Sequence, residues 1–187
     1  VGARTTLYVG FVAVGVAALL GVPLGILSAM GPRWLDGLIM RAADIGLAFP
    51  GLLLAITFAA VFGASTTSAM FAIGLASVPS FARVTRAGAL GVLPREFITA
   101  ARVAGRRPAS IGWHHVLPNV VGLVIVQASV SFALAILAEA GLSFLGFGTP
   151  PPTPSWGRML QESQSLLASD PRLAIVPGVA IALAVLG

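Results

Sequence analysis

The sequence has 187 residues, of which 57% are hydrophobic and 9% are charged. Soluble domains carry about 25% charged residues, so this composition excludes an ordinary soluble fold and indicates an integral membrane protein. The formal net charge is +5, and the chain has neither lysine nor cysteine. The absence of lysine excludes the P-loop ATPases, whose Walker A lysine reaches the phosphates. The absence of cysteine excludes disulfides and iron–sulfur clusters.

Three charge-free runs, at 5–32, 45–82 and 108–138, are each longer than the roughly 20 residues that a membrane-spanning helix needs. The first predicts a span over 7–29, ended by Gly31-Pro32 and kinked by Pro23. Small residues recur in it every four positions, a spacing that lets helix backbones approach closely, and general packing explains it better than a special role. These residues are Ala13, Ala17, Gly21, Gly25 and Ala29.

The middle of the chain predicts a connector, two short spans and a basic segment. The connector covers 33–44 and carries Trp34 where an interfacial aromatic anchor would lie. The second charge-free run divides at the turn-rich residues 63–68 into helices over 45–62 and 69–82. A basic segment over 83–116 follows. A further span is expected over 117–138, with Pro118 in its first turn, where its missing N–H costs nothing.

The last part of the chain predicts a loop, a surface helix and one more span. Residues 147–157 are rich in glycine and proline. Trp156, Met159 and Leu160 then recur near helical spacing among polar residues, which is typical of a helix lying on a membrane surface. Asp170-Pro171 ends this helix, and the apolar run 173–187 is the fifth predicted span. If the basic segment is cytoplasmic, the alternating spans place only Arg4, Arg158 and Arg172 outside and all the other arginines on the cytoplasmic side. This bias agrees with the positive-inside rule.

The basic segment predicts two short helices folded over a tight turn. The first covers 96–104, where Phe97, Ala101 and Ala104 share one face. Gly105 follows, at a position where a left-handed conformation favours glycine. Pro108 suits the first turn of the second helix. Together they form a compact knob on the cytoplasmic side.

These residues resemble a known motif. Thr99-Ala100-Ala101, Gly105 and Leu117-Pro118 resemble the EAA loop of ABC-importer permeases, with the pattern E-A-A, three residues, G, nine residues, I, one residue, L-P. Thr99 replaces the acidic residue and His115 the isoleucine, and both departures are similar to the dipeptide/oligopeptide/nickel branch. Further pieces resemble the second, C-type permease of that branch, in order along nearly the whole chain: IMR at 39–41, AFP at 48–50, HVLPN at 115–119, EAGLSFLG at 139–146 and PPTPSWG at 151–157.

The resemblance implies an all-α integral membrane fold, the transmembrane domain of a type I ABC importer, in a bacterial or archaeal inner membrane. It implies one permease domain over 1–187, with a cytoplasmic coupling loop at 83–116 and an external loop and surface helix at 147–171. The family has six spans and five are counted, so we expect the first helix and the C-terminal tail to lie outside this sequence. The implied partners are a sister permease, two P-loop ATPase subunits and an extracytoplasmic solute-binding protein. The subunit itself needs no cofactor and is not an enzyme. The candidate coupling residues are Thr99, Ala100, Ala101, Gly105, Ile111, His115, Leu117 and Pro118.

Polar residues in the last long span are candidates for the translocation path. Gln127 and Ser131 lie one helical turn apart and either line the path or bond another helix. Glu139 lies near the outer edge, where a snorkelling or helix-ending acid is favoured over a solute contact. His114 and His115 are adjacent and so do not face each other on a helix, which disfavours a metal site.

The implied function is that of the membrane subunit of an ATP-driven importer for peptides or similar small solutes, such as nickel chelates. Two alternatives remain. A secondary transporter typically has internal repeats and coupling-ion acids in mid-membrane, and neither is evident. An intramembrane enzyme needs a catalytic pair, which the sequence does not provide. Dependence of transport on added ATPase subunits separates the importer from the first alternative, and hydrolysis by the purified chain would favour the second.

Overall fold

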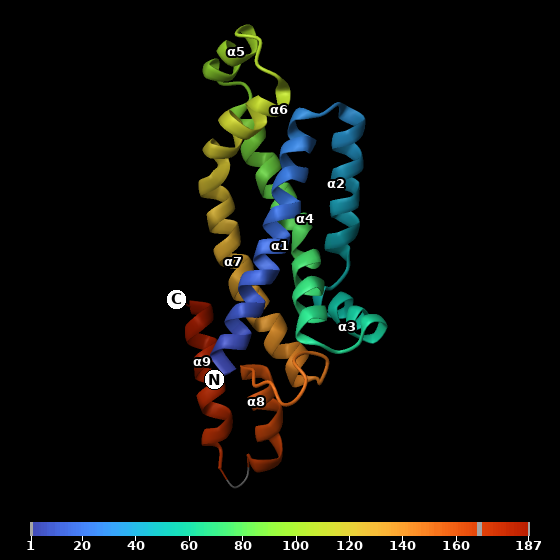
Figure 1. Ribbon diagram of the computed structural model, residues 1–187, viewed down its shortest axis with the longest axis vertical. Coiled ribbons are helices and arrows are strands. Elements are labelled where there is room, and N and C mark those ends of the chain that lie inside the picture. The colour runs from blue at the N-terminus through green and yellow to red at the C-terminus, as the bar shows by residue number, and fades with distance from the viewer. Residues whose placement is uncertain (1, 168–169, 187) are drawn as a thin grey trace. The chain divides into compact units, whose positions relative to one another are not determined.

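The computed structural model describes residues 2–167 and 170–186, and in these residues every regular element is a helix. The elements in chain order are α1 (Gly2–Met30), α2 (Arg33–Ala48), α3 (Gly51–Phe62), α4 (Thr66–Val92), α5 (Glu96–Val103), α6 (Pro108–Ile111), the π-helical η1 (Gly112–Val116), α7 (Leu117–Phe144), α8 (Trp156–Ser163), the short 3-10 helix η2 (Gln164–Leu166) and α9 (Arg172–Leu186) (Figure 1).

Three helical stretches in the described residues are long and apolar enough to cross a membrane: α1, α4 and the continuous run Pro108–Phe144. The number rises to four if the bent pair α2 and α3 is counted as one broken span. The shorter apolar helix α9 has 15 residues. The five predicted apolar segments therefore all fall on helices, but only three or four meet the length that a span requires.

Two predicted boundaries are wrong. The predicted connector 33–44 is helical and belongs to α2, and the helix predicted over 69–82 continues to Val92 as part of α4. Both extensions carry charges, which is why charge-free runs do not detect them. Arg83 and Arg86 of α4 form ion pairs with Asp44 and Asp36 of α2, and this pairing lets charged residues continue two packed helices. The predicted loop over 83–116 therefore begins only after Val92.

The breaks between helices follow the local backbone chemistry. The predicted break at 63–68 is confirmed, because α3 ends at Phe62 and Gly63 has φ of +86°. The helix predicted over 45–62 is interrupted before Pro50, and Phe49 and Pro50 separate α2 from α3. Proline disfavours a helical conformation in the residue before it, which explains this interruption. Pro79 lies inside α4 rather than at its end.

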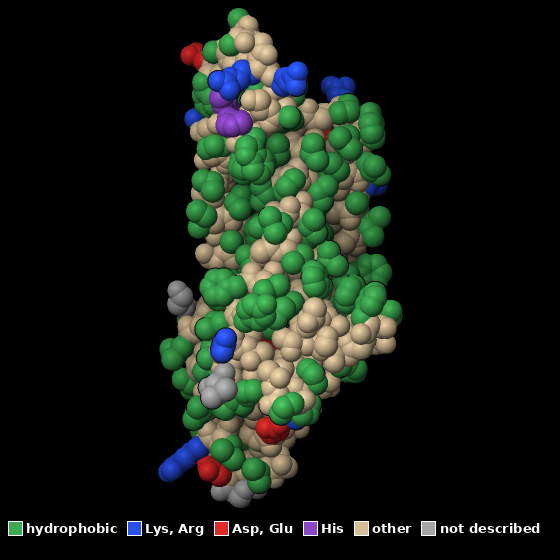
Figure 2. Space-filling view, in the orientation of Figure 1, with side chains coloured by type: hydrophobic (Ala, Val, Ile, Leu, Met, Phe, Trp, Pro, Cys, Tyr) green, Lys and Arg blue, Asp and Glu red, His purple; other side chains and the backbone are tan. Residues whose placement is uncertain are grey.

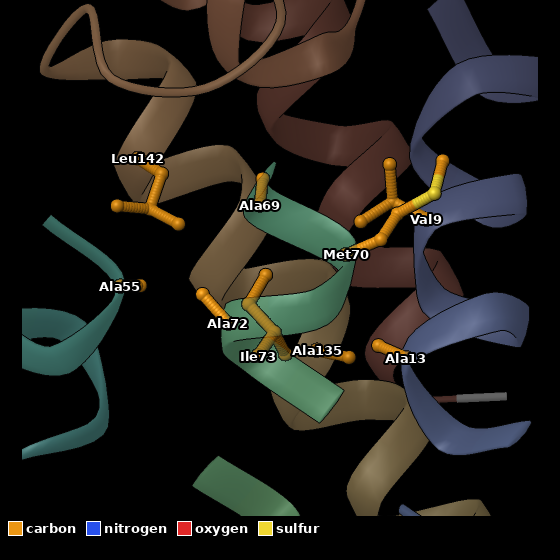
Figure 3. Packing of buried hydrophobic residues seen from close by; sticks show 9 residues of the cluster. All are labelled: Val9, Ala13, Ala55, Ala69, Met70, Ala72, Ile73, Ala135 and Leu142. Carbon is orange, nitrogen blue, oxygen red and sulfur yellow. The ribbon is translucent and has the colours of Figure 1, made fainter. Parts of the chain in front are cut away.

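The chain divides into two compact units, here called the first unit (1–16, 49–77 and 130–187) and the second unit (17–48 and 78–129). The core of the first unit is built mainly from small side chains, which lets its helices pack closely. Figure 3 shows this cluster converging from α1, α3, α4 and α7. Its buried members are Val9, Ala13, Ala55, Ala69, Met70, Ala72, Ile73, Ala135 and Leu142.

In the second unit, α1 packs directly on the backbone of α4. A Cβ atom added at Gly21 would lie 2.5 Å from the Cβ of Phe81, and one added at Gly25 would lie 2.5 Å from the carbonyl oxygen of Ala82. Neither position has room for a side chain. The four-residue spacing of small residues is therefore explained at these two glycines by helix packing, as predicted.

Candidate functional site

The turn after α5 is formed as its sequence predicts. The Gly105 N–H donates to the carbonyl oxygen of Arg102 at 3.0 Å, and the Arg106 N–H donates to that of Ala101 at 3.1 Å. These two bonds define a Schellman motif, which requires a left-handed residue at its centre. Gly105 has φ of +75°. Pro108 then occupies the first turn of α6, where its missing N–H is not needed.

The buried face of α5 differs from the predicted one. Ile98 and Ala101 are buried in the second unit, whereas Phe97 is 41% exposed and Ala104 is exposed. Ile98 and Ala101 belong to one core cluster with Val92, Ile111, Val116 and Val120, which anchors α5 to α4, α6 and α7. Ala101 belongs to both faces, so the helix is rotated from the predicted orientation by less than the roughly 100° that one residue represents. Thr99 and Ala100, of the motif that resembles the EAA loop, are exposed.

The outward surface of this segment is basic. Four arginines lie on it or at its edges, all exposed: Arg95, Arg102, Arg106 and Arg107. Figure 2 shows basic and histidine side chains gathered around α5 and α6. Within the described residues none of these four arginines forms an ion pair. Their charge is therefore available to solvent or to an acidic partner surface.

The last long α-helix, α7, begins at Leu117 as predicted, but it continues α6 and η1, so that helix runs without a break from Pro108 to Phe144. Pro118 consequently lies inside a helix, where it cannot donate a hydrogen bond and its ring would strike the carbonyl four residues earlier. The π-helical segment η1 widens the helix just before it, and the Leu117 N–H bonds the carbonyl of Gly112, five residues back. The Asn119 side chain donates to the carbonyl oxygen of His115 at 2.7 Å.

The two histidines lie in the π-helical segment. The Nδ1 atom of His114 is 3.1 Å from the carbonyl oxygen of Ser110, and His115 is half-buried. Among the described residues no group of three or more acidic or histidine side chains is arranged to hold a metal ion.

An ion-pair cluster fixes α2 in the second unit. Arg86 donates from Nε and Nη2 to the two carboxylate oxygens of Asp36, at 2.6 and 2.7 Å, and Ser28 of α1 donates to the same carboxylate. Arg83 pairs with Asp44, about two helical turns further along α2. Sequence reasoning missed this cluster. The spacing of Asp36 and Asp44, close to two helical turns, could have indicated it.

Polar residues of α7 fall in different surroundings. Gln127 is half-buried, Ser131 is buried, and Glu139 is fully buried. The burial of Glu139 rules out the predicted snorkelling to solvent. Its Oε2 atom accepts a hydrogen bond from Thr6 at 3.0 Å, and its Oε1 atom accepts one from Ser143 at 2.7 Å. The carboxylate is therefore held by two hydroxyl groups within the first unit.

A helix follows the proline-rich loop as predicted, but this helix, α8, ends at Ser163 and not at the predicted Asp170-Pro171. Ser155 caps it by accepting a hydrogen bond from the Arg158 N–H at 3.2 Å. Trp156 and Leu160 pack against a cluster that contains Ile136 of α7. A Cβ atom at Gly157 would overlap the backbone of α7 at Ala140. The helix α8 therefore packs closely on α7.

The chain has close matches among known proteins. The profile of the family described as "Binding-protein-dependent transport system inner membrane component" matches residues 21–187. The dipeptide transport system permease protein DppC of Alkalihalophilus pseudofirmus is 44% identical over 186 residues, which are 100% of this chain and 61% of that protein. The glutathione transport system permease protein GsiD of Pectobacterium atrosepticum is 38% identical over 185 residues, which are 99% of this chain and 62% of that protein. The chain thus spans about three fifths of the length of these relatives.

A solved structure shows the same fold. A chain of the MetNI methionine ABC transporter, in an inward-facing conformation, matches with a TM-score of 0.83 and 17% sequence identity, over 98% of this chain and 88% of that chain. The match confirms the predicted all-helical fold.

Proposed function

Because the chain belongs to the family of inner-membrane components of binding-protein-dependent transport systems, we propose that it acts as the transmembrane subunit of an ATP-driven importer for peptides or similar small solutes. Two relatives of 38 to 44% identity carry the names of dipeptide and glutathione permeases, and glutathione is itself a small peptide. This agreement favours peptides over nickel chelates as the solute class.

The observation that carries the proposal is the shape and charge of residues 93–118. Two short helices are folded over a Schellman turn at Gly105 and are anchored through buried Ile98 and Ala101. Their outward face carries arginines that form no ion pair within the described part of the chain. Such a knob suits docking to a partner rather than catalysis or solute binding, and we propose that it receives the ATPase subunits. The coupling role of Thr99, Ala100, Ile111, His115, Leu117 and Pro118 is part of this proposal.

The proposed mechanism is alternating access. Closure of two P-loop ATPase subunits on ATP would move the knob, and its anchoring to α4 and α7 would transmit this motion to the spans. A solute-binding protein on the outer side would deliver the solute to a path formed with a sister permease. A conformational equilibrium of this kind shifts only through ligands that bind its two states with different affinity. Gln127 and Ser131 of α7 are our candidates for contacts along the path. The hydrogen bonds that occupy Glu139 favour a different role for that residue.

The test is reconstitution of the full-length protein with its partner subunits in vesicles. We expect uptake of a labelled dipeptide to require ATP, the ATPase subunits and the binding protein together, and no ATP hydrolysis by the permease alone. Uptake driven by an ion gradient without ATPase subunits would instead support a secondary transporter.

Membrane orientation can be tested separately, because the chain has no natural cysteine. We expect a cysteine at Ser110 to react with an impermeant reagent only from the cytoplasmic side and a cysteine at Thr153 only from outside. Labelling of Ser110→Cys in intact cells would contradict the assignment of the knob to the ATPases.

A further inference from the structure

The buried polar cluster around Glu139 has a connectivity that helix packing alone does not require. The Thr6 hydroxyl donates to the carboxylate at 3.0 Å and accepts a hydrogen bond from the Trp156 N–H at 3.2 Å. The Ser143 hydroxyl donates to the other carboxylate oxygen at 2.7 Å and accepts one from the Thr149 N–H at 3.1 Å. Two parallel relays therefore run from backbone amides, through hydroxyl groups, to one carboxylate.

The direction of the two bonds from backbone amides is fixed by chemistry. A backbone N–H can only donate, and a hydroxyl group has a single proton. Each hydroxyl that accepts from an amide keeps its own proton, which it donates to a carboxyl oxygen of Glu139. The Glu139 side chain accepts both of these hydrogen bonds. Hydrogen bonds joined in this way strengthen one another in a low-dielectric surrounding.

The amide donors of the two relays lie at the two ends of the loop between α7 and α8. Thr149 and Trp156 bracket the proline-rich stretch 150–155, so the cluster holds the loop at both of its ends. The hydrogen bond from Thr149 to Ser143 lies in a closely packed region, since a Cβ atom at Gly148 would overlap the Ser143 hydroxyl. Thr6, Ser143 and Glu139 are all at most 2% exposed, so water cannot replace either relay without opening the unit.

The bracketed stretch forms one wall of a groove in the first unit. The groove has a volume of about 500 Å³, and Thr153 and Pro154 of the loop line it together with Arg4, Tyr8 and two threonines. Arg4 is the one charged residue among these lining residues. A partner segment with an acidic side chain would complement this groove.

We propose that Glu139 is a positioning residue that, through Thr6 and Ser143, fixes the loop 149–156 and with it the groove that receives an acidic segment of the solute-binding protein. The docking part of this inference rests on the proposed function. The fixing of the loop by the two relays does not.

The first experiment measures the loop directly, in the full-length protein assembled with its partners. A spin label is attached to a cysteine at Thr153. Thr6→Val removes the hydroxyl and keeps the branched shape, while the matched control Thr6→Ser keeps the hydroxyl. We expect a more mobile label in Thr6→Val and wild-type mobility in Thr6→Ser. Equal label mobility in all three proteins would overturn the inference, as would a Thr6→Ser variant as mobile as Thr6→Val.

The second experiment measures docking, with unlabelled proteins. We expect Thr6→Val to raise the binding-protein concentration for half-maximal ATPase stimulation about tenfold, the upper end of the net contribution of one hydrogen bond. The maximal stimulated rate and the basal rate should stay unchanged, and Thr6→Ser should restore the wild-type concentration. A loss of stability alone would instead lower the amount of active protein and the maximal rate without moving the half-maximal concentration, and this result would refute the positioning role.

Two outcomes separate the inference from the proposed function. If the wild-type assembly shows no response to binding protein, the proposed function fails, while the label mobility still decides whether the relays fix the loop. If Thr6→Val cannot be purified, Ser143→Ala breaks the other relay and is judged by the same two readouts.

Discussion

The turn at Gly105 gives the sharpest test of the coupling knob, because a substitution there changes the backbone strain without causing a steric clash. A Cβ atom added at Gly105 would meet no atom within 4 Å, so a larger side chain causes no collision. The cost of substitution comes from φ of +75° alone. An L-residue in this region loses about 1–2 kcal/mol, and a β-branched residue lies at the unfavourable end, whereas asparagine tolerates it.

We therefore compare Gly105→Val with Gly105→Asn. A penalty of about 2 kcal/mol shifts the equilibrium between the closed and the opened turn about 30-fold. Opening the turn breaks the bonds from Gly105 and Arg106 to the end of α5 and reorients the knob. We expect Gly105→Val to insert normally, since no long apolar helix changes, and to lose most of the ATPase stimulation by loaded binding protein together with uptake. Gly105→Asn should keep both.

The assay is ATPase stimulation and uptake measured on the same reconstituted vesicles, with Arg106→Ala as a control for charge. Arg106 is exposed and has no ion pair within the described residues, so its loss should be the milder change. Full coupling in Gly105→Val, equal defects in the valine and asparagine variants, or a more damaging Arg106→Ala would each refute the argument from turn geometry.

Three further predictions test the packing inside each unit. Gly25→Ala should lower the free energy of unfolding by about 1–3 kcal/mol, because the added carbon would meet the backbone of α4. The control Gly15→Ala should leave it unchanged, because a Cβ atom there meets nothing within 4 Å. Equal melting temperatures for the two variants in detergent would contradict this. Asp36→Asn should lower the free energy of unfolding by about 1–3 kcal/mol, because it removes a part-buried ion pair with two hydrogen bonds. Asp44→Asn should lower it by only about 0–1 kcal/mol, because its ion pair is exposed. The same thermal melt should therefore show the larger loss for Asp36→Asn. Trp156→Ala should cost about 2–4 kcal/mol through the loss of packing on α7 and α9, so purified yield should fall as well as transport, and an unchanged melting temperature would contradict it.

The parts of the fold that sequence reasoning predicted depend on neighbouring residues. The left-handed glycine after α5 and the proline that starts α6 act through their own backbone, so Gly105 and Pro108 place the turn correctly. The break at Gly63 follows for the same reason. These elements could be predicted from the sequence because their conformation does not depend on contacts with residues far away in the chain.

The errors arise where a distant residue decides the outcome. Charge-free runs ended α4 too early, because Arg86 is neutralised by Asp36, which is remote in sequence. The acid Glu139 was expected at a solvent-facing edge, but Thr6, 133 residues away in the chain, supplies one of its partners. Spacing along one helix shows that a polar residue is present but does not show which hydroxyl group faces it.

The π-helical segment η1 gives the protein a site where the loss of one residue should disturb the neighbouring helices less than elsewhere. A π turn holds one residue more than an α turn, so Gly112–Val116 stores a spare residue between α6 and α7. Deleting one residue there can be absorbed by conversion to regular α-helix, which leaves α7 intact and keeps α6 near its present direction, because a π turn and an α turn each complete about one revolution of the helix. The same deletion inside α7 would instead rotate every lipid-facing and core-facing side chain beyond it. Natural single-residue deletions in this helical run should therefore concentrate at 112–116, where they shorten the run without changing the spans or the direction in which the arginine-bearing knob faces.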